Sequence, residues 1–391
     1  MNKYLIIVLL TVTSLTAKSQ ADSQAIKNLM ATGTIEFISD KIKAAEVFTK
    51  VIEIAPQHAM AYYMRAQCYY GLQQIDEAFQ DLEKMMDLVP KDARPYALRG
   101  VIYVDIQDYY QAVIDYTKAI ELNPINGSYY YSRGFIQVKL KNAWYAIKDF
   151  EQAIEFKYTD KDLYFWMGYA YLLLNDFSKA VSNIDYSIEK GKRDADAYYH
   201  LGHSKMLLKM YDAALKDFAL ALLYDEKYGP VYFDQGYVYI QLSEYQNAIN
   251  SLTKGIELVP NLAMGYVNRG IAYKAILKYE EAIADFSKAI ELELTYPDPY
   301  FHRCLVYDEL KEYEKALKDI ITYTQLYPGD GNAIYQRGRL HVYTNNLENA
   351  CRDLREAAML GNQTAIETVD EVCKLLEKHQ SEMQEQENKS K

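Results

Sequence analysis

Cysteine is scarce in this sequence, which contains 4 in 391 residues. No two of them form the CxxC pattern of a zinc knuckle, and together they do not make the framework of a disulfide-rich domain. Tryptophan is scarcer still, with 2 residues. The fold must therefore rest on packing of the chain itself rather than on metal or on a set of disulfides.

The short motifs of common enzymes are missing as well. The sequence contains no nucleophile elbow, no P-loop, no dinucleotide fingerprint and no HExxH motif. We therefore expect that the protein is not an enzyme and that it needs no cofactor.

Long apolar runs are absent beyond the N-terminus. Lys3 precedes a short apolar run at residues 4–17, and Ala17 and Ser19 are small residues at positions −3 and −1 of a cleavage site before Gln20. The alternative, a membrane anchor, needs about 20 apolar residues. We expect a signal peptide at residues 1–19, export to the periplasm or out of the cell, and no transmembrane segment in the mature chain.

Positive charge is in deficit. The formal net charge is −11, and removal of Lys3 and Lys18 with the first 19 residues, which contain no acid, would bring it to −13. An acidic chain without a basic stripe binds nucleic acid poorly. We expect no nucleic-acid partner.

A pattern that recurs every 34 residues is the most specific feature that is present. With Ala93 as position 1, position 8 is glycine in most units: Gly100, Gly134, Gly168, Gly202, Gly236, Gly270 and Gly338. Position 20 is alanine in every unit: Ala44, Ala78, Ala112, Ala146, Ala180, Ala214, Ala248, Ala282, Ala316 and Ala350. Position 4 is tyrosine in eight units: Tyr62, Tyr96, Tyr130, Tyr164, Tyr198, Tyr232, Tyr266 and Tyr300.

With this spacing the chain resembles the tetratricopeptide repeat family, with Tyr where Trp often stands. The resemblance implies an all-α fold, a right-handed superhelical α-solenoid of ten helix-turn-helix repeats over residues 25–364. Each repeat would contain a helix A and then a helix B. We expect a C-terminal capping helix at 365–379 and a disordered polar tail at 380–391.

An electrostatic pattern follows the same period. Position 7 is Arg in six repeats: Arg65, Arg99, Arg133, Arg269, Arg303 and Arg337. Position 23 of the same repeats is Asp: Asp81, Asp115, Asp149, Asp285, Asp319 and Asp353. We infer a structural Arg–Asp pair between helices A and B. Where Arg is replaced by Met167 or Gln235, the acid is lost too; Leu201 with Asp217 breaks this rule.

The remaining cysteines of interest are Cys351, on helix B of the last repeat, and Cys373, on the capping helix expected to stack after it. An exported chain permits oxidation, so this pair is a disulfide candidate. Two free core thiols are the alternative.

The resemblance implies that the A helices line a concave groove that binds partners. The repeats that depart most from the pattern, at residues 161–262, carry aromatic and polar side chains on these helices. They are Phe165, Trp166, Tyr169, Tyr199, His200, His203, Phe233, Asp234 and Tyr237. We predict that they bind an extended peptide; the alternative is that these rings only pack between neighbouring A helices.

The favoured function is thus a non-catalytic exported scaffold that binds a protein or peptide partner. A first alternative is an accessory subunit of a cell-envelope or secretion assembly that uses its outer surface. A second is a metal-dependent enzyme or metal-binding protein centred on His200 and His203, with Asp234 near them. The oligomeric state and the partner stay open.

Overall fold

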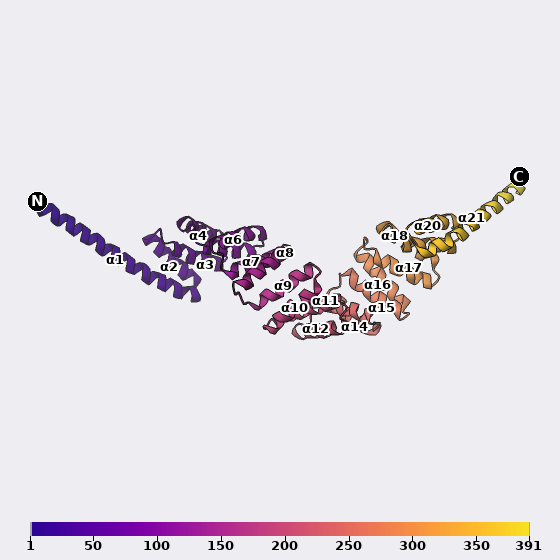
Figure 1. The fold of residues 1–391 in the computed structure, drawn as a ribbon, viewed down its shortest axis with the longest axis horizontal. Helices are drawn as coiled ribbons and strands as arrows, with labels where there is room; N and C mark the ends of the chain where they lie inside the picture. The colour runs from indigo at the N-terminus through magenta and orange to yellow at the C-terminus, as the bar shows by residue number, and fades with distance from the viewer. Residues whose placement is uncertain (1, 391) are drawn as a thin grey trace. The chain divides into compact units, whose positions relative to one another are not determined.

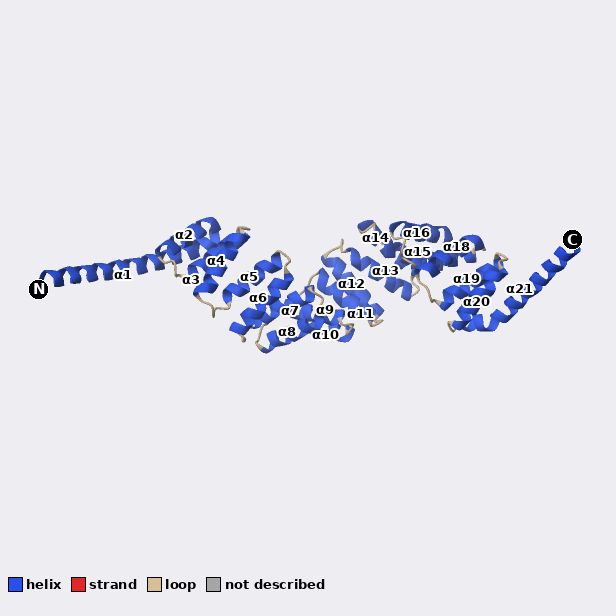
Figure 2. Ribbon diagram, turned by 90° about the horizontal axis from the view of Figure 1, so that it is seen from above, coloured by secondary structure: helices blue, strands red, loops and turns tan. Residues whose placement is uncertain are grey.

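The computed structural model describes the backbone of residues 2–390 and the side chains of residues 20–378 and 380–383. Within these bounds the chain is all-α, with 21 helices, and Figures 1 and 2 show only helices and the loops between them. It divides into two compact parts, Met1–Lys192 and Arg193–Lys391, here called the N-terminal and C-terminal parts.

In each part the helices form consecutive packed pairs, as the sequence predicts. The N-terminal part contains α1 (Asn2–Ser39), α2 (Lys41–Ile54), α3 (Ala59–Gly71), α4 (Ile75–Leu88), α5 (Arg94–Asp105), α6 (Tyr109–Leu122), α7 (Gly127–Lys139), α8 (Ala143–Glu155), α9 (Lys161–Leu173) and α10 (Phe177–Glu189). The C-terminal part contains α11 (Ala195–Leu207), α12 (Tyr211–Tyr224), α13 (Gly229–Gln241), α14 (Tyr245–Leu258), α15 (Ala263–Ala275), α16 (Tyr279–Leu292), α17 (Asp298–Glu309), α18 (Tyr313–Leu326), α19 (Gly331–Tyr343), α20 (Leu347–Met359) and α21 (Gln363–Ser390). The odd-numbered helices up to α19 are the A helices, and the even-numbered ones are the B helices.

Glycine recurs at position 8 because a side chain there would collide with a side chain of helix B. A Cβ on Gly134 would lie 2.9 Å from the ring of Phe150, and one on Gly202 would lie 2.7 Å from that of Phe218. Both rings are fully buried side chains at position 24 of helix B. In these two repeats the missing Cβ therefore lets the buried ring at position 24 lie directly against helix A.

In nine of the ten repeats the turn from helix A to helix B holds one residue in the left-handed region. In repeat three the Asp108 amide donates to the Tyr103 carbonyl at 2.8 Å, the six-to-one bond of a Schellman motif. The left-handed residue lies at position 15 in nine repeats: Gln73, Gln107, Lys141, Asn175, Lys209, Ser243, Leu277, Lys311 and Asn345. None of these is Gly, which usually occupies this position.

The predicted Arg–Asp pair is confirmed in all six repeats. In repeat three, Arg99 Nε and Nη2 each donate to a carboxylate oxygen of Asp115 at 2.8 Å. The other five pairs have the same two-bond geometry. The arginine thereby ties helix A to helix B within a repeat.

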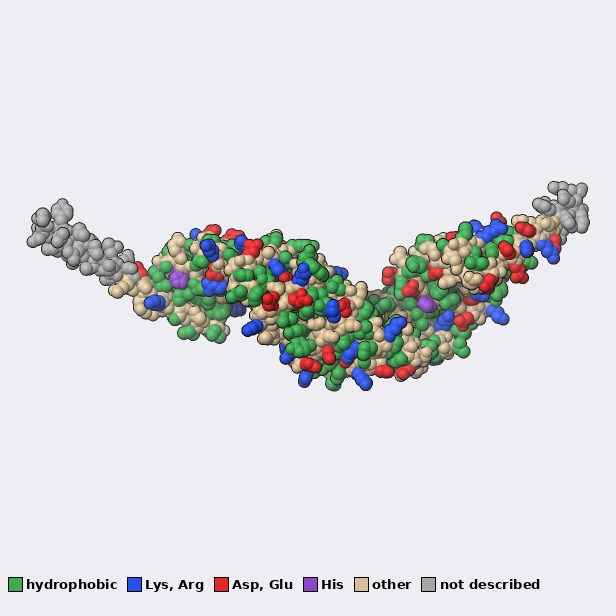
Figure 3. All heavy atoms as spheres, viewed as in Figure 1, with side chains coloured by type: hydrophobic (Ala, Val, Ile, Leu, Met, Phe, Trp, Pro, Cys, Tyr) green, Lys and Arg blue, Asp and Glu red, His purple; other side chains and the backbone are tan. Residues whose placement is uncertain are grey.

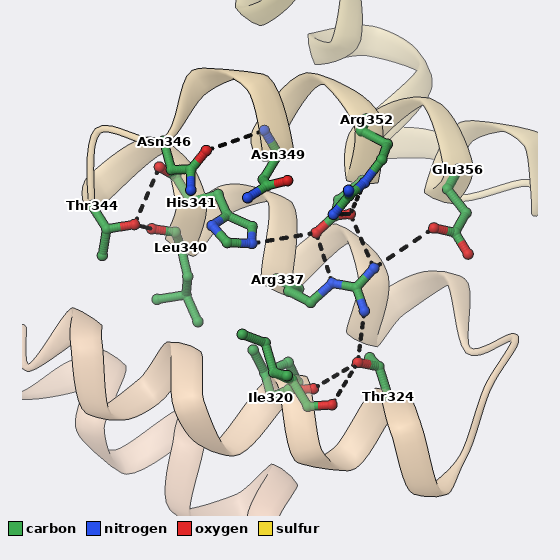
Figure 4. Close-up of polar contacts among 12 residues, drawn as sticks. Ile320, Thr324, Arg337, Leu340, His341, Thr344, Asn346, Asn349, Arg352 and Glu356 are labelled. Atoms are coloured by element: carbon green, nitrogen blue, oxygen red, sulfur yellow. Dashed lines mark hydrogen bonds and ion pairs between the residues drawn. The ribbon is translucent and has the colours of Figure 1, made fainter.

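The same arginine also reaches the preceding repeat, which the sequence pattern did not reveal. Arg133 Nη1 donates to the Thr117 hydroxyl at 3.1 Å, and Arg269 Nη1 to that of Thr253 at the same distance. Figure 4 shows Arg337 in this role, with its third bond to Thr324 on α18. One guanidinium therefore joins three helices.

Repeat seven replaces this ion pair by a neutral contact. The Ser251 hydroxyl donates to the Gln235 side-chain carbonyl at 3.4 Å. In repeat six Asp217 keeps an ionic partner, because Lys205 Nζ lies 2.7 Å from its carboxylate. Repeat six therefore has an ion pair after all, supplied from position 11 instead of position 7.

The ends of the chain bear on three expectations. Helix α1 continues from Asn2 to Ser39, and the side chains of the predicted signal peptide lie outside the described residues. Helix α21 begins at Gln363 rather than at residue 365, and its backbone is helical to Ser390. The predicted disordered tail lies mostly beyond the described side chains. In the described residues no helix has the length and apolar character to cross a membrane.

A disulfide joins Cys351 on α20 to Cys373 on α21, with Cα atoms 5.1 Å apart. That distance lies within the range that a disulfide allows. Cys68 and Cys304 are free and buried. The bond would hold the last helix against the final repeat.

Candidate partner-binding surfaces

Several successive A helices contact each other within each part. Besides packing on its own B helix, α7 contacts α9, and in the C-terminal part α11 contacts α13 and α13 contacts α15. Side chains at positions 5, 6 and 9 of successive A helices therefore come together. The predicted site residues fall in both parts, three on α9 and six on α11 and α13.

In the C-terminal part, His203 on α11 meets Asp234 on α13. The Nδ1 atom of His203 lies 2.7 Å from Asp234 Oδ2, and the side chains are 30% and 17% exposed. Tyr237 follows Asp234 by three residues on the same helix and is 40% exposed. These three side chains combine a polar centre with an accessible ring.

Two tyrosines extend this group. The Tyr199 ring centroid lies 5.7 Å from that of His203 and 5.2 Å from that of Tyr228. The Tyr228 hydroxyl donates to Asp196 Oδ1 at 2.6 Å. Sequence reasoning did not select Tyr228, because position 34 at the end of a repeat was not among the positions assigned to the groove.

His200 lies one residue after Tyr199, and burial lowers its pKa to about 4, against a smaller opposing effect of Asp196. Its imidazole is therefore neutral near pH 7. Across the described residues no three His, Cys, Asp or Glu side chains group to hold a metal ion. His203 is bonded to Asp234.

Two of the predicted residues belong to the core. Phe233 is 4% exposed, and a Cβ on Gly265 would lie 2.5 Å from its ring. Phe165 is 3% exposed. The sequence could not separate these positions from surface ones, because position 5 lies at the edge between the groove and the packing of adjacent repeats.

The α9 residues of the N-terminal part form a second aromatic group. The Trp166 ring lies 4.9 Å from that of Phe135 on α7 and 6.0 Å from that of Tyr169. Lys139 Nζ lies 4.7 Å over the Trp166 ring. Trp166 and Tyr169 are half-buried.

Charges of both signs alternate over the visible surface of each part, and hydrophobic side chains lie among them (Figure 3). No large basic area occurs on this face of the described residues.

Comparisons with known proteins agree with the fold. Three family models, each described as tetratricopeptide repeat, match residues 42–114, then 195–228 and 229–262, and 263–296. The last three ranges coincide with repeats six, seven and eight as the sequence spacing divides them. No curated protein matches the chain.

Solved structures match as well. One is the structure of the C-terminal part of a TPR repeat-containing protein from Cytophaga hutchinsonii, which is 17% identical to this chain. The match covers 61% of this chain and 98% of that structure, with a TM-score of 0.51. Another is the structure of a tetratricopeptide repeat protein from Parabacteroides merdae ATCC 43184, which is 17% identical. The match covers 64% of this chain and 98% of that structure, with a TM-score of 0.49.

Consecutive helix pairs at this spacing define an all-α repeat protein. The chain is a tetratricopeptide repeat protein.

Proposed function

We propose that the protein is a non-catalytic, exported scaffold that binds a protein or peptide partner on the A-helix face of α11 and α13. The observation that carries this proposal is the His203–Asp234 bond between successive A helices beside the exposed ring of Tyr237. Exposed tyrosines next to satisfied polar groups are frequent at binding hot spots. The family and its fold favour protein interaction over catalysis, and the N-terminal apolar run supports export.

The acidic groups Asp196 and Asp234 favour a basic or hydroxyl-rich segment of the partner. Asp234 has a second carboxylate oxygen that can accept a bond from such a segment. An extended peptide that lies across α11 and α13 would contact Tyr237 and Tyr199 with its apolar side chains.

The test is a crosslinking pull-down from native envelope material with the wild-type chain and the variant Tyr237→Ala. The matched control is Tyr224→Ala, which removes a 51% exposed tyrosine from the B helix α12. We expect capture to be lost with Tyr237→Ala and retained with Tyr224→Ala, with both variants folded by circular dichroism. Capture that survives Tyr237→Ala would move the interface away from this face.

Export has its own test. Mass spectrometry of the native protein should find a mature N-terminus near Gln20. An intact Met1 on the mature protein would contradict the proposed localisation.

The alternative function, an accessory subunit that binds through its outer surface, is favoured by one observation. Trp144 and Tyr145 on the B helix α8 are 53% and 59% exposed. Loss of the captured partner with Trp144→Ala but not with Tyr237→Ala would favour this alternative.

A further inference from the structure

A cleft of about 660 Å³ opens on the B-helix side of the N-terminal part, between α6 and α8. Val113 and Thr117 of α6 line one side, Trp144 and Lys148 of α8 line the other, and Gln137 of α7 lies between. None of these residues belongs to the A-helix face proposed above, so the cleft is a separate surface.

At this cleft, repeat four lacks a tyrosine ring that six other repeats have. Position 11 is tyrosine in six repeats: Tyr69, Tyr103, Tyr171, Tyr239, Tyr273 and Tyr307. In repeat three the Tyr103 ring packs 5.1 Å from Phe79, at position 21 of the preceding B helix, and in repeat five Lys179 at position 19 lies 5.1 Å over Tyr171. The ring thus fills the space between two successive B helices.

In repeat four this position is Gln137, which is smaller and turned aside. Its side-chain carbonyl accepts a bond from the Asn142 amide at 3.0 Å. The equivalents of the two partners of the ring, Val113 at position 21 and Tyr145 at position 19, both line the cleft instead. No tyrosine ring therefore occupies this position in repeat four, although a second cleft, of about 630 Å³, occurs where Tyr69 is present in repeat two.

The rim of the cleft has an aromatic side chain at a position that is polar in most other repeats. Position 18, which is Trp144 here, is polar in seven repeats: Asp76, Ser178, Asp212, Gln246, Glu280, Glu314 and Glu348. On α6, Tyr110 and Ile114 are 74% and 58% exposed and share a helical stripe with Val113 and Thr117. Contiguous exposed apolar patches mark interaction sites on protein surfaces.

The charge at the cleft is positive, although the chain is acidic with a net charge of −11. Lys148 Nζ lies 3.6 Å over the Trp144 ring, and no ion pair of Lys148 occurs among the described residues. The other charged lining groups, Arg133 and Asp149, neutralise each other at 2.7 Å. The net charge of the lining is therefore that of Lys148.

We propose that this cleft binds a partner peptide through one hydrophobic side chain flanked by carboxylates. The side chain enters the cleft beside Gln137 and contacts Val113 and Trp144. An adjacent carboxylate pairs with Lys148, which lies over the Trp144 ring. The acidic requirement distinguishes this partner from the basic segment favoured on the A-helix face.

The test uses the full chain with Trp166→Phe, which leaves Trp144 as the sole tryptophan. The probes are three acetylated and amidated pentapeptides, Gly-Asp-Leu-Asp-Gly, Gly-Asp-Ala-Asp-Gly and Gly-Lys-Leu-Lys-Gly. We expect a saturable shift of Trp144 emission to shorter wavelength with the first peptide, because the ring leaves water. The other two should bind at least about tenfold more weakly.

Two variants of the same single-tryptophan chain complete the test. Gln137→Tyr introduces the residue that six other repeats have and should fill the space beside Val113 and Tyr145, with a loss of at least about tenfold in affinity and a retained fold by circular dichroism. Lys148→Glu, on the surface, should abolish the preference for the acidic peptide. No saturable shift, an unchanged affinity in Gln137→Tyr, or equal binding of the lysine peptide would overturn the proposal. None of these results bears on the A-helix face, which Tyr237→Ala tests.

Discussion

Lys205 and Asp217 form an ion pair in repeat six, with Nζ 2.7 Å from Oδ2, where the other charged repeats use arginine at position 7. Asp217 is 7% exposed, so an unpaired carboxylate there would be costly. Lysine at position 11 reaches the same carboxylate from one helical turn further along helix A. The buried Asp at position 23 is therefore paired in two ways, with arginine at position 7 in six repeats and with lysine at position 11 in repeat six.

The contribution of the Lys205–Asp217 ion pair to stability can be tested in repeat six. Lys205→Met should lower the free energy of unfolding by about 3 kcal/mol, because it leaves the Asp217 carboxylate buried without its ionic partner. Adding Asp217→Asn should recover part of the loss, since the charge is then gone. Urea unfolding followed by circular dichroism measures both. A double variant no more stable than Lys205→Met would contradict the pairing as the reason.

The Arg99–Asp115 pair should show strong coupling. Asp115 is 3% exposed and accepts two bonds from Arg99, so either single alanine variant leaves a buried group without its partner. A double-mutant cycle with Arg99→Ala and Asp115→Ala should give a coupling energy of about 1–3 kcal/mol. The exposed pair Lys118–Glu121 is the control and should couple far more weakly.

Leu277 is expected to cost stability at the turn of repeat eight. Its φ is 62°, in the left-handed region, and its side chain is 69% exposed, so it gains little from packing. Leu277→Asn should raise the free energy of unfolding by about 1 kcal/mol. Asn345→Leu, at the same position of repeat ten, should change stability in the opposite direction. Urea unfolding of the two variants measures both changes. A shift of both unfolding midpoints in the same direction would contradict the argument from the left-handed backbone conformation.

His200 should make the protein less stable in acid. Burial holds its pKa at about 4 in the folded chain, whereas the unfolded chain protonates it near its ordinary value of 6.5. As pH falls from about 6.5 to about 4, protons therefore bind the unfolded state first and stability decreases, by at most about 3 kcal/mol. Above pH 6.5 this group has no effect.

The measurement compares unfolding free energies of wild type and His200→Gln across this pH range. The variant should show a shallower decline. His302 and His341 also have lowered pKa values through burial, so the wild-type curve contains their effects too. The difference between the two curves isolates His200, and parallel curves would contradict its buried neutral state.

The disulfide between Cys351 and Cys373 closes a segment with a sequence separation of 22. The double variant Cys351→Ser and Cys373→Ser should lose about 3 kcal/mol, because the unfolded chain regains the entropy of the open loop. Non-reducing peptide mapping of oxidised native protein should find these two cysteines linked and Cys68 and Cys304 free. Free thiols at Cys351 and Cys373 in that material would contradict the bond.

Much of the fold follows from the sequence alone, because the repeat is local. Glycine at position 8, alanine at position 20 and the Arg99–Asp115 type of pair are each set within one helix pair, so a period in the sequence maps directly onto a contact. The family and the helix order were predictable for this reason. Export and the handedness of the superhelix stay predictions.

Tertiary structure alone decided which side chains remain accessible. Phe233 and Tyr237 are alike in the sequence pattern, yet one ring is buried between repeats and the other is 40% exposed. The cleft at Gln137 is lined in part by the B helix of the preceding repeat. Lys205 pairs with Asp217 from position 11, where most repeats have tyrosine. Such outcomes depend on the space between successive repeats, which a position within one repeat does not specify.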